Sequence, residues 1–597
     1  MKTRKNHALA ALCLLCVFRA SAATHYVNVN NSAPAPPYTN WAAAAVAIQD
    51  ALDVAGPGDQ ILVTNGSYQV GTRIAPDGST NRVVVTNALA LQSVNGFTAT
   101  SITGATNVRC VYLTNGAFLA GFTLNSGNAA NGGGIYCPST NVLVSNCWLI
   151  HNTAGSGGGA YSGTFTNCTF WTNQCPLTGN SGGGAYGATL YNCLLSNNYT
   201  GSTLNSGATC GGGACASVLY SCTLFGNNAR GAGANGGNAY NCVLSNCTLK
   251  NGYADFDAGG AYESTLTNCI LYNNRAPSGS GGGVLGGTLY NCGLYWNSAG
   301  SMGGGADFSA TLYNCILTNN TANYGGGEGS STLVNCLLFN NSSGGYGGGA
   351  YYGTLINCTL VSNTTLLYTY GGGAYNCTLD NSVIYYNTAG GTAADVSSCT
   401  LNYCCSPAAA GFGNITNAPL FVAPTAGNCR LQSNSPCINS GRNSYVTTTT
   451  DLDGNPRIAG GTVDMGAYEY ATPASLISYA WLQQYGLPID GSADSADYDN
   501  TGMTVYQDWI AGLNPTNPLS VLKMNSVLAT NSPPGLVVTW QSVSGVTYFL
   551  QSSSNLGSQP AFSTIRSNIT GQSVSTSYTD TAATNPSSYF YRVGVSH

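Results

Sequence analysis

A short unit built around an Asn-Cys step recurs through the middle of this chain. Its cysteines fall at intervals of 19–29 residues, at Cys147, Cys168, Cys193, Cys222, Cys247, Cys269, Cys292, Cys315, Cys336, Cys358 and Cys377. Glycine runs separate the copies, as in residues 347–351, Gly-Gly-Gly-Ala-Tyr. A recurrent unit of this size is typical of a solenoid, in which each unit buries its apolar face only against its neighbours.

The spacing inside the unit indicates short strands, because 19–29 residues leave room for two or three strands and their turns but not for a helix. Cys358 and Leu360 are two residues apart, so they share one strand face. Leu355 reaches the same interior if the chain turns at Asn357, since Asn tolerates a left-handed backbone. We therefore predict an all-β fold, a right-handed parallel β-helix with Cys, Leu and Asn ladders repeating every ~4.8 Å.

The cysteines have two interpretations. An exported chain with 24 of them, two inside the first 22 residues, could carry a disulfide framework. One cysteine per coil at an inward position is instead typical of a small buried apolar residue. We expect unbridged thiols in the ladder and a disulfide between Cys429 and Cys437. Cys315→Ser should then cost about 1–3 kcal/mol by burying a hydroxyl without a partner.

The amino terminus has the pattern of a cleaved export signal. Lys2, Arg4 and Lys5 precede an apolar run from 8 to 18, and Ala-Ser-Ala at 20–22 is a small-residue cleavage site. We predict that residues 1–22 are a signal peptide. The run is too short for a membrane anchor, and no later segment is long and apolar enough to span a bilayer. The mature chain is expected to be extracellular or attached to the cell surface, and monomeric.

Charge limits the partners. Charged residues make up only 6% of the chain, and removing the signal leaves 12 basic against 21 acidic residues, a formal charge of −9. Nucleic acid requires clustered Lys and Arg, so it is excluded as a partner, as is an anionic membrane surface. A polysaccharide or a cell-surface protein remains as a partner.

Residues 23–130 read as an amino-terminal cap and the first, irregular coils. Residues 26–29 form a strand, and Asn40 can cap a helix in which Trp41, Ala44, Ala45, Ile48 and Leu52 share one face. This order resembles the amino-terminal cap of pectin-lyase-like β-helices. A cap is needed because an open end exposes apolar surface and unpaired strand edges.

Residues 131–405 hold the regular repeats. Their Gly-Gly-Gly-Ala-Tyr runs, with Leu-x-x-Asn after each cysteine, resemble the repeats of polymorphic outer-membrane adhesins; one example is residues 170–173, Phe-Trp-Thr-Asn. The resemblance implies the β-helix fold. The tripled glycine and the cysteine ladder depart from that family, and its host-cell role and carboxy-terminal barrel are not carried over.

Residues 406–472 close the β-helix. The segments 435–441, 451–457 and 461–470 together resemble the end of secreted β-helix proteins of the choice-of-anchor kind. That family joins a β-helix to one of several surface-attachment or sorting tails. The acids of these segments form either a hydrogen-bonded end cap or a metal or catalytic cluster, and we favour the end cap.

Residues 473–519 contain a candidate calcium loop. Asp497, Asp499, Thr501 and Asp508 supply hard oxygen ligands in the D-x-D-x-[DNST]-G-x5-[DE] pattern, and the carbonyl of Met503 is the position-7 ligand. The stretch resembles dockerin and thrombospondin type-3 calcium modules, with a helix over 505–511. A neutral threonine and a short closing acid depart from the pattern, and a solvated acidic turn is the alternative. We expect Ca²⁺ to order residues 490–517 without being needed by the β-helix.

Residues 520–597 alternate as strands do, at 536–540, 547–551, 577–580 and 589–595. We predict a small β-sandwich of general fibronectin-III-like appearance, with Trp540 and Tyr591 in its core.

A catalytic site would need acids and a base in one groove. Galacturonan hydrolases of this fold carry Gly-His-Gly and Arg-x-Lys motifs, and the sequence has neither. The best catalytic set is Asp257, Glu263, Asp307 and Glu328, each beside a glycine run, with Arg275 and Lys250 as the nearest bases. Isolated surface acids explain these four equally well.

Two functions remain. The favoured one is a secreted or surface-associated structural, adhesive or glycan-binding scaffold, supported by monotonous coils, low charge and the carboxy-terminal modules. The alternative is an extracellular polysaccharide lyase or glycoside hydrolase, which rests on analogy of fold alone.

Overall fold

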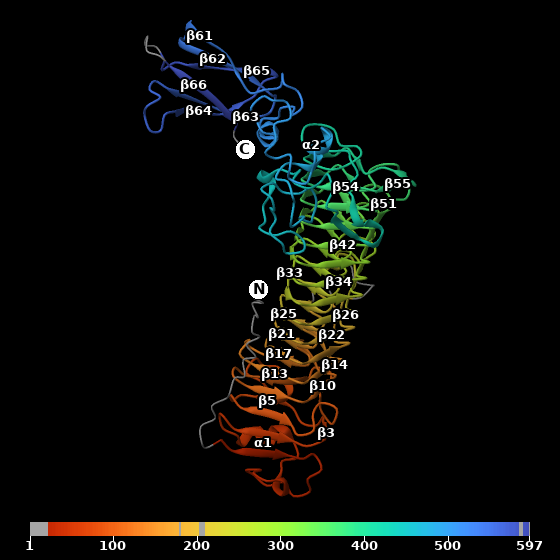
Figure 1. The fold of residues 1–597 in the computed structure, drawn as a ribbon. Coiled ribbons are helices and arrows are strands. Elements are labelled where there is room, and N and C mark those ends of the chain that lie inside the picture. Colours follow the sequence, from red (N-terminus) through yellow and green to blue (C-terminus); the bar gives the residue numbers. More distant parts are fainter. Residues whose placement is uncertain (1–21, 178, 180, 202–208, 584–588, 596–597) are drawn as a thin grey trace. The chain divides into compact units, whose positions relative to one another are not determined.

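The computed structural model describes residues 22–177, 179, 181–201, 209–583 and 589–595 (Figure 1). The expected signal peptide lies outside these residues except for Ala22. The described chain is mostly β-structure with little helix, and it forms two compact units. The first runs to residue 354 and includes 362–378 and 386–399; the second comprises 355–361, 379–385 and 400–597.

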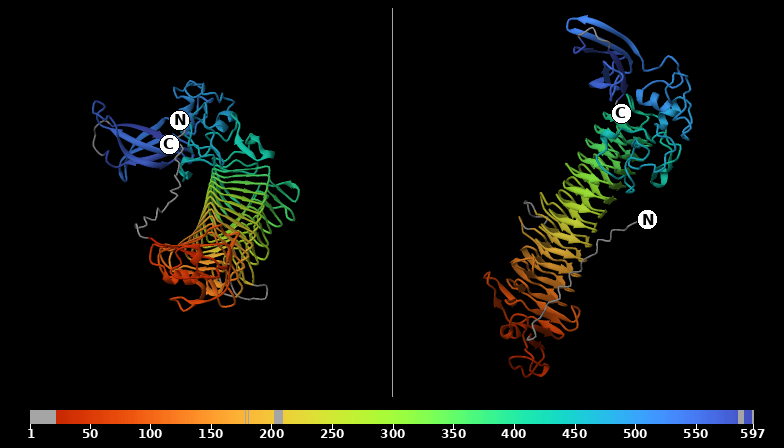
Figure 2. Two further views of the ribbon diagram at one scale, coloured as in Figure 1. Left: turned by 90° about the horizontal axis from the view of Figure 1, so that it is seen from below. Right: turned by 60° about the vertical axis from the view of Figure 1, so that its left-hand side comes forward.

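Four nearly all-parallel sheets of 16, 15, 14 and 13 strands form the predicted parallel β-helix, of about 13 turns (Figure 2). The 16-stranded sheet runs from β1 (Thr24–Val27) to β58 (Thr400–Asn402), the 15-stranded sheet from β4 (Arg73–Ile74) to β57 (Val396–Ser397), and the 13-stranded sheet from β11 (Asn128–Asn131) to β56 (Thr392–Ala393). The 14-stranded sheet comprises β3 (Gly66–Tyr68), β7 (Thr100–Thr103), β10 (Thr123–Asn125), β14 (Trp148–Ile150), β18 (Thr169–Trp171), β22 (Leu194–Ser196), β26 (Thr223–Phe225), β30 (Thr248–Lys250), β34 (Ile270–Tyr272), β38 (Gly293–Tyr295), β42 (Ile316–Thr318), β46 (Leu337–Phe339), β50 (Thr359–Val361) and β54 (Val383–Tyr385).

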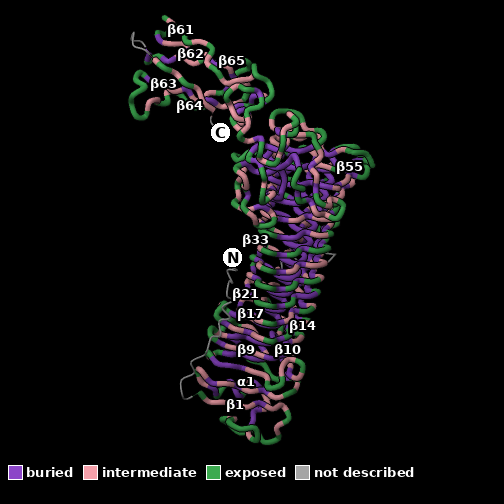
Figure 3. Tube along the Cα trace, in the orientation of Figure 1, coloured by how far each residue is buried: buried purple, intermediate pink, exposed green. Residues whose placement is uncertain are grey.

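One coil shows how the sequence makes the turn of the helix. It contains β39 (Ser298–Ala299), β40 (Ala306–Asp307), β41 (Thr311–Tyr313) and β42, one strand for each sheet. Between β41 and β42 the backbone of Asn314 has φ 53°, the left-handed corner that the sequence predicts. The corner directs Leu312 and Cys315 both inward, and neither is exposed. Buried positions recur along the coils in this way (Figure 3). The predicted ladders of Leu, Cys and Asn are therefore confirmed.

The cysteines form no disulfide in the described chain, and all but Cys210 and Cys399 are buried. In the ladder, stacked Cβ atoms are separated by about one strand spacing, ~4.8 Å, which exceeds the ~3.8 Å of a typical disulfide. The expected bridge between Cys429 and Cys437 is wrong. Cys429 lies in β60 (Asn428–Leu431), whereas the carbonyl of Cys437 accepts a hydrogen bond from Met465 N at 3.0 Å.

A natural serine in the cysteine ladder changes the expected cost of Cys315→Ser. Ser382 follows Cys358 in the ladder, its Oγ accepting from Cys358 N at 3.0 Å and donating to Asp380 O at 2.9 Å. The sulfur of Cys315 already lies 3.3 Å from the equivalent carbonyl, that of Tyr313. A hydroxyl at this position would therefore find partners, contrary to the sequence-based expectation.

Cys377 belongs to a second column and not to the main ladder. It lies at the corner between the 15- and 16-stranded sheets, where its Sγ accepts from Gly353 N at 3.3 Å and its N–H donates to Cys399 Sγ at 3.4 Å. Ser217, Cys242 and Ser264 make the same kind of contact one coil after another.

Buried asparagines at the end of Leu-x-x-Asn form a further ladder, separate from the corner asparagines that the sequence predicts. Asn320 is typical, because its Nδ2 donates to Leu294 O and Asn341 Oδ1 at 2.9 and 3.0 Å. Its Oδ1 accepts from both the N–H and the Nδ2 of Asn297, at 2.9 and 3.0 Å. The glycine run makes room for this amide, since a Cβ at Gly305 would lie 3.2 Å from the Asn320 side chain.

The amino-terminal helix begins later than the sequence predicts. The side chain of Asn40 accepts from Ala43 N, but it caps only the 3-10 turn η1 (Trp41–Ala43), because Ala44 has an extended ψ of 141°. The helix α1 spans Ile48–Val54 and packs on β1, β2 (Gln60–Val63) and β5 (Thr80–Val85). The first coils are also more regular than expected, since β1 and β2 already pair in parallel.

The second unit contains short elements after the coils. They are β59 (Phe421–Ala423), η2 (Pro424–Ala426), β60, η3 (Asn443–Tyr445), α2 (Tyr479–Gln484) and α3 (Val505–Ala511). Helix α3 has the predicted bounds, with a Thr504 capping box at one end and Gly512 at φ 67° at the other. No helix among the described residues is long and apolar enough to cross a membrane.

Two three-stranded antiparallel sheets end the described chain. One is β61 (Met524–Asn531), β62 (Pro534–Ser542) and β65 (Val574–Asp580); the other is β64 (Ser563–Thr570), β63 (Thr547–Ser553) and β66 (Phe590–Val595). Trp540 is fully buried in their shared apolar cluster, as predicted. Tyr591 is only half-buried there, and its hydroxyl donates to the buried Asp580 Oδ2 at 2.8 Å.

Candidate functional site

Two of the four catalytic candidates lie close together. Asp257 Oδ1 accepts from Ser280 N at 2.8 Å, and the Ser280 side chain also hydrogen-bonds to Asp307. Burial raises the pKa of both carboxyls, to about 6 for Asp307, where the charge of Asp257 adds to the effect. Asp307 is 1% exposed, and its Oδ1 has no hydrogen-bond partner in the described chain. Ser280 therefore bridges two carboxyls, of which Asp307 offers substrate almost no surface.

The other two candidates lie apart from this pair. Glu263 is an exposed corner residue with φ 43°, and its charge acts on Tyr240 and Tyr262. Glu328 is fully buried in β44 (Glu328–Gly329), at the inward position that alanine holds in the neighbouring coils. Its Oε2 accepts from Ser331 N at 3.0 Å, and Gly353 leaves room for the carboxylate. The Glu328 side chain thus fills space inside the core and satisfies the backbone N–H of Ser331 at the corner of the coil.

The two candidate bases, Lys250 and Arg275, lie on different sheets from Asp307. Lys250 is in β30 of the 14-stranded sheet, with Nζ 5.2 Å from the ring centre of Tyr272. Arg275 is in β35 (Arg275–Ala276) of the 13-stranded sheet, whereas Asp307 is in the 15-stranded sheet. The expected groove of acids and bases is therefore not assembled.

The acids at the end of the β-helix bind backbone groups. Asp464 accepts from Asn439 N and Tyr470 N, and Glu469 accepts from Ala459 N and Asp464 N. Burial raises the pKa of Asp464 to about 7 and of Glu469 to about 9, while Arg457 lies 3.8 Å from Glu469 Oε2. These contacts hold irregular backbone together and leave the carboxylates little capacity for a ligand.

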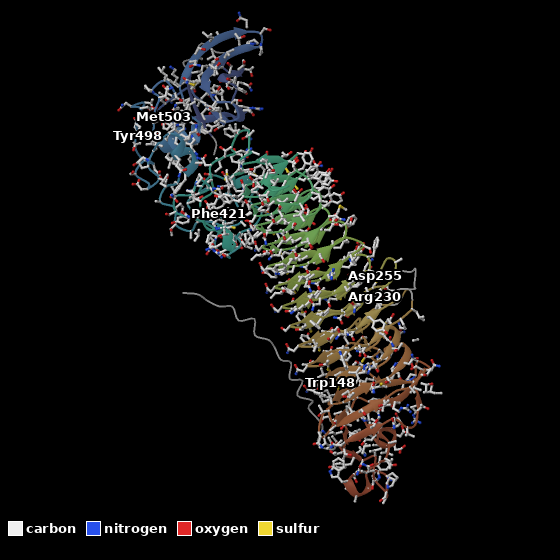
Figure 4. All side chains as sticks on the ribbon, turned by 90° about the vertical axis from the view of Figure 1, so that its right-hand side faces the viewer. Trp148, Arg230, Asp255, Phe421, Tyr498 and Met503 are labelled. Carbon is white, nitrogen blue, oxygen red and sulfur yellow. The ribbon has the colours of Figure 1, made fainter. Side chains whose placement is uncertain are left out.

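The predicted calcium loop has the turn that such a site requires (Figure 4). Asp497 Oδ2 accepts from Gly502 N at 2.9 Å, and Asp499 Oδ1 accepts from the Thr501 hydroxyl at 2.9 Å. Asp508, the closing acid of the pattern, lies in the first turn of α3. Asn500 has φ 57° and Gly502 φ 82°, which fold the loop back on itself.

Two buried oxygens in this loop lack partners. Asp499 and Asp508 are 5% and 1% exposed, and neither Asp499 Oδ2 nor Asp508 Oδ1 is hydrogen-bonded in the described chain. Burial and the charges of Asp499 and Asp497 raise the pKa of Asp508 to about 6. As they lie, no three His, Cys, Asp or Glu side chains among the described residues are grouped tightly enough to hold a metal ion. The orphaned oxygens and the hard oxygen donors nevertheless fit Ca²⁺.

The expected disorder of the whole 490–517 segment is not what the surrounding contacts indicate. Asp494 accepts from the Ser475 hydroxyl at 2.6 Å and from Leu476 N at 2.9 Å. Ile477, Leu482, Ala493 and Val505 form a buried cluster with Trp481 and Trp509 against it. The segment has its own apolar core, so any effect of a cation is confined to the loop from 497 to 508.

The outer face of the 14-stranded sheet carries aromatic rings on alternate coils. In register along β18, β22, β26, β30 and β34, the last outward position is occupied by Trp171, Ser196, Phe225, Lys250 and Tyr272. Trp171, Phe225 and Tyr272, the aromatic row, are each 38–43% exposed. Two strand spacings, about 9.5 Å, separate each ring from the next. Trp148, labelled in Figure 4, extends the exposed face on β14.

The rings of the aromatic row are not stacked on each other. Among the described residues Phe225 contacts no other ring, and Trp171 meets only His151, tilted at 47° with centroids 5.5 Å apart. Tyr295, one coil beyond Tyr272, folds its own ring over Gly293, where a Cβ would lie 2.4 Å from it. The rings of the row therefore do not cover one another, although the ammonium of Lys250 lies 5.2 Å from the centre of the Tyr272 ring.

Tyrosines on the other faces are arranged differently. On the 16-stranded sheet Tyr290 and Tyr313 stack with centroids 5.2 Å apart and planes 7° from parallel. On the 15-stranded sheet Tyr136, Tyr161 and Tyr186 stack at 5.3 and 5.1 Å. These rings cover one another's faces, so they stabilise the coils and offer only edges to solvent.

Sequence reasoning missed the aromatic row although a signal was present. Its members stand three residues after a ladder cysteine, namely after Cys168, Cys222 and Cys269. Reading down that position from Cys168 to Cys269 would have shown three bulky rings alternating with Ser196 and Lys250, a pattern that ends at Tyr295. The distances along the chain vary, so no fixed sequence period connects the three rings.

Comparison with known proteins gives a likeness in fold. No family model matches, and no curated protein sequence does. Among solved structures, the pectate lyase Pel9A aligns over 75% of this chain and 97% of its own with 14% identity and TM-score 0.20. A rhamnogalacturonan lyase aligns over 67% and 91% with 11% identity and TM-score 0.23, and the Dettilon tailspike protein over 63% and 68% with 11% and 0.28. These likenesses are distant and carry no argument about activity.

Proposed function

We propose that the protein is a secreted or cell-surface right-handed β-helix scaffold that binds a polysaccharide along the outer face of its 14-stranded sheet. The observation that carries the proposal is the aromatic row of Trp171, Phe225 and Tyr272, exposed without mutual stacking. Sugar C–H groups are weakly positive and pack on the negative face of an aromatic ring. Because the scaffold would act by display, it needs no catalytic groove.

The end of the chain would support this display. A Ca²⁺ ion held by Asp497, Asp499, Thr501, Asp508 and the Met503 carbonyl would neutralise the loop and brace it before the terminal sheets, a small fibronectin-III-like sandwich in our proposal. The support is the pair of orphaned buried carboxylate oxygens. When bound, the ion would supply charge neutralisation and rigidity.

A pull-down tests the binding proposal. The full mature chain is mixed with insoluble polysaccharides of several linkages, and the bound fraction is compared with that of a Trp171→Ala/Phe225→Ala/Tyr272→Ala variant. Tyr290→Ala, on a stacked pair of the 16-stranded sheet, is the matched control. We expect binding by the wild type and the control and its loss in the triple variant. No binding by the wild type, or equal binding by all three, would end the proposal.

The second candidate is cleavage of a glycan, supported by the carboxyls of Asp257 and Asp307, which Ser280 bridges. A carboxyl with a pKa of about 6 can act as a general acid near neutral pH. The near-complete burial of Asp307 makes this the weaker candidate. Release of reducing ends from the same polysaccharides that disappears in Asp307→Asn, with the fold intact, would establish it in place of the scaffold.

A further inference from the structure

We infer that the aromatic row is built for a neutral, extended polysaccharide with a two-fold repeat, of the β-1,4-linked kind, lying along the axis of the coils. The inference rests on the proposed function and specifies its ligand. It starts from the alternation of the row, since the register places Trp171, Phe225 and Tyr272 on every second strand.

The first step compares the repeats of protein and ligand. Neighbouring strands are ~4.8 Å apart, so the rings recur at about 9.5 Å and the outer two are about 19 Å apart. A pyranose in an extended β-1,4-linked chain advances the chain by about one strand spacing. Successive sugars in such a ribbon are turned over, so the same sugar face recurs at every second residue. The rings of the row would therefore meet equivalent faces of alternate sugars.

The second step concerns the gaps between the rings. Ser196 is small and 8% exposed, so nothing rises between Trp171 and Phe225 to obstruct a flat chain. Lys250 lies between Phe225 and Tyr272, with its ammonium held 5.2 Å above the tyrosine ring. It can donate hydrogen bonds to the hydroxyls of the intervening sugar.

The third step is charge. The five positions of the row carry one cation and no acid, while the mature chain has a formal charge of −9. A polyuronate would meet one lysine and the repulsion of the whole chain, and a polycation would meet no acid on this face. A neutral glycan loses nothing to either effect. A helical chain such as a β-1,3-linked glucan would present a new face at each ring and could meet only one of them well.

The test uses titration calorimetry with hexamers of β-1,4-linked glucose, β-1,3-linked glucose and galacturonic acid. We expect the β-1,4-linked hexamer to bind most tightly and to lose affinity in steps as it is shortened to four and two sugars. Loss of one ring, as in Phe225→Ala, should weaken binding about tenfold, the effect of one good aromatic contact.

A variant that shifts the middle ring to the neighbouring coil gives the most discriminating part of the test. Ser196→Phe/Phe225→Ser keeps the composition of the face and moves the middle ring by one coil, about 4.8 Å. We expect it to bind the β-1,4-linked hexamer at least as weakly as Phe225→Ala, while Tyr290→Ala binds as the wild type does. Undiminished binding by the shifted variant, or equal affinity for the β-1,3-linked hexamer, would overturn the inference but leave polysaccharide binding standing. No binding of any hexamer or polymer would overturn both.

Discussion

Removing one amide from the buried asparagine ladder should destabilise the coils far more than removing the half-buried amide next to it in the sequence. Asn320→Ala deletes four hydrogen bonds, leaves the N–H of Asn297 without a partner, and removes from the carbonyl of Leu294 a second donor beside its strand partner Thr318. Both residues are fully buried. At roughly 1–3 kcal/mol for the one buried unsatisfied N–H and about 1 kcal/mol for the second hydrogen bond that Leu294 loses, the cost is about 3 kcal/mol.

The adjacent Asn319 is the matched control, because it occupies a half-buried left-handed corner with φ 57° outside the ladder. Glycine adopts that conformation without strain, so Asn319→Gly should change the free energy by less than about 1 kcal/mol. Urea unfolding followed by circular dichroism gives the two midpoints. Hydrogen exchange then locates the damage, which should be concentrated in the coils next to Asn320, because a solenoid contact acts between neighbours. Equal midpoints for the two variants, or exchange raised uniformly along the chain, would refute the reasoning.

Three further predictions follow from the thiols, the loop and the end of the β-helix. Cys315→Ser should shift the urea midpoint by the equivalent of less than about 1 kcal/mol, because the hydroxyl finds the partners that Ser382 has; a loss of 3 kcal/mol would contradict this. Chelation of calcium should open the 497–508 loop to a non-specific protease, and Asp499→Ala should mimic chelation; identical digests with and without chelator would remove the site. A carboxyl whose pKa is raised on folding stabilises the fold below its ordinary pKa and loses that contribution as the pH rises. The end of the β-helix should therefore become less stable between pH 5 and 9, because the pKa values of Asp464 and Glu469 are raised. The measurement is hydrogen exchange in residues 451–470, which should increase over this range after correction for intrinsic rates. Asp464→Asn should reduce that dependence, and an unchanged slope would count against the cause.

The elements that repeat were readable from the sequence because their physics is local. The Leu-x-Asn-Cys-x-Leu pattern requires a corner at the asparagine, and Asn314 adopts φ 53° there. Helix α3 was equally readable, since its cap residue, apolar face and terminal glycine all lie within one short stretch. In each case the signal and the structure that it specifies are separated by a few residues.

Compensation between distant residues was not readable in the same way. Gly252 stands where the ladder needs an asparagine, and Asn238 supplies the amide from the third position of a glycine run. A Cβ at Gly252 would lie 2.3 Å from Asn238 Nδ2, so the two departures from the repeat explain each other. Neither departure is interpretable until the register between coils is known.

The candidate sites depended on the same register. The contact of Asp257 and Asp307 through Ser280 crosses coils joined by loops of unequal length. Glu328 directly follows its glycine run and points into the core, whereas Asp307 stands one residue later and lies on the opposite face of its strand, so strand alternation already distinguishes the two. Cys377 could have been assigned correctly, because it follows its glycine run by four residues where Cys358 follows by nine.

Footprinting of the outer face of the 14-stranded sheet tests the central proposal most directly. The full mature chain is exposed to hydroxyl radicals with and without the β-1,4-linked glucose hexamer, and oxidation is measured by peptide mass spectrometry. We expect oxidation of Trp171, Phe225 and Tyr272 to fall together when the glycan is bound, while that of Tyr290 stays constant. Unchanged oxidation of the three rings at saturating glycan, or an equal fall at Tyr290, would contradict the account.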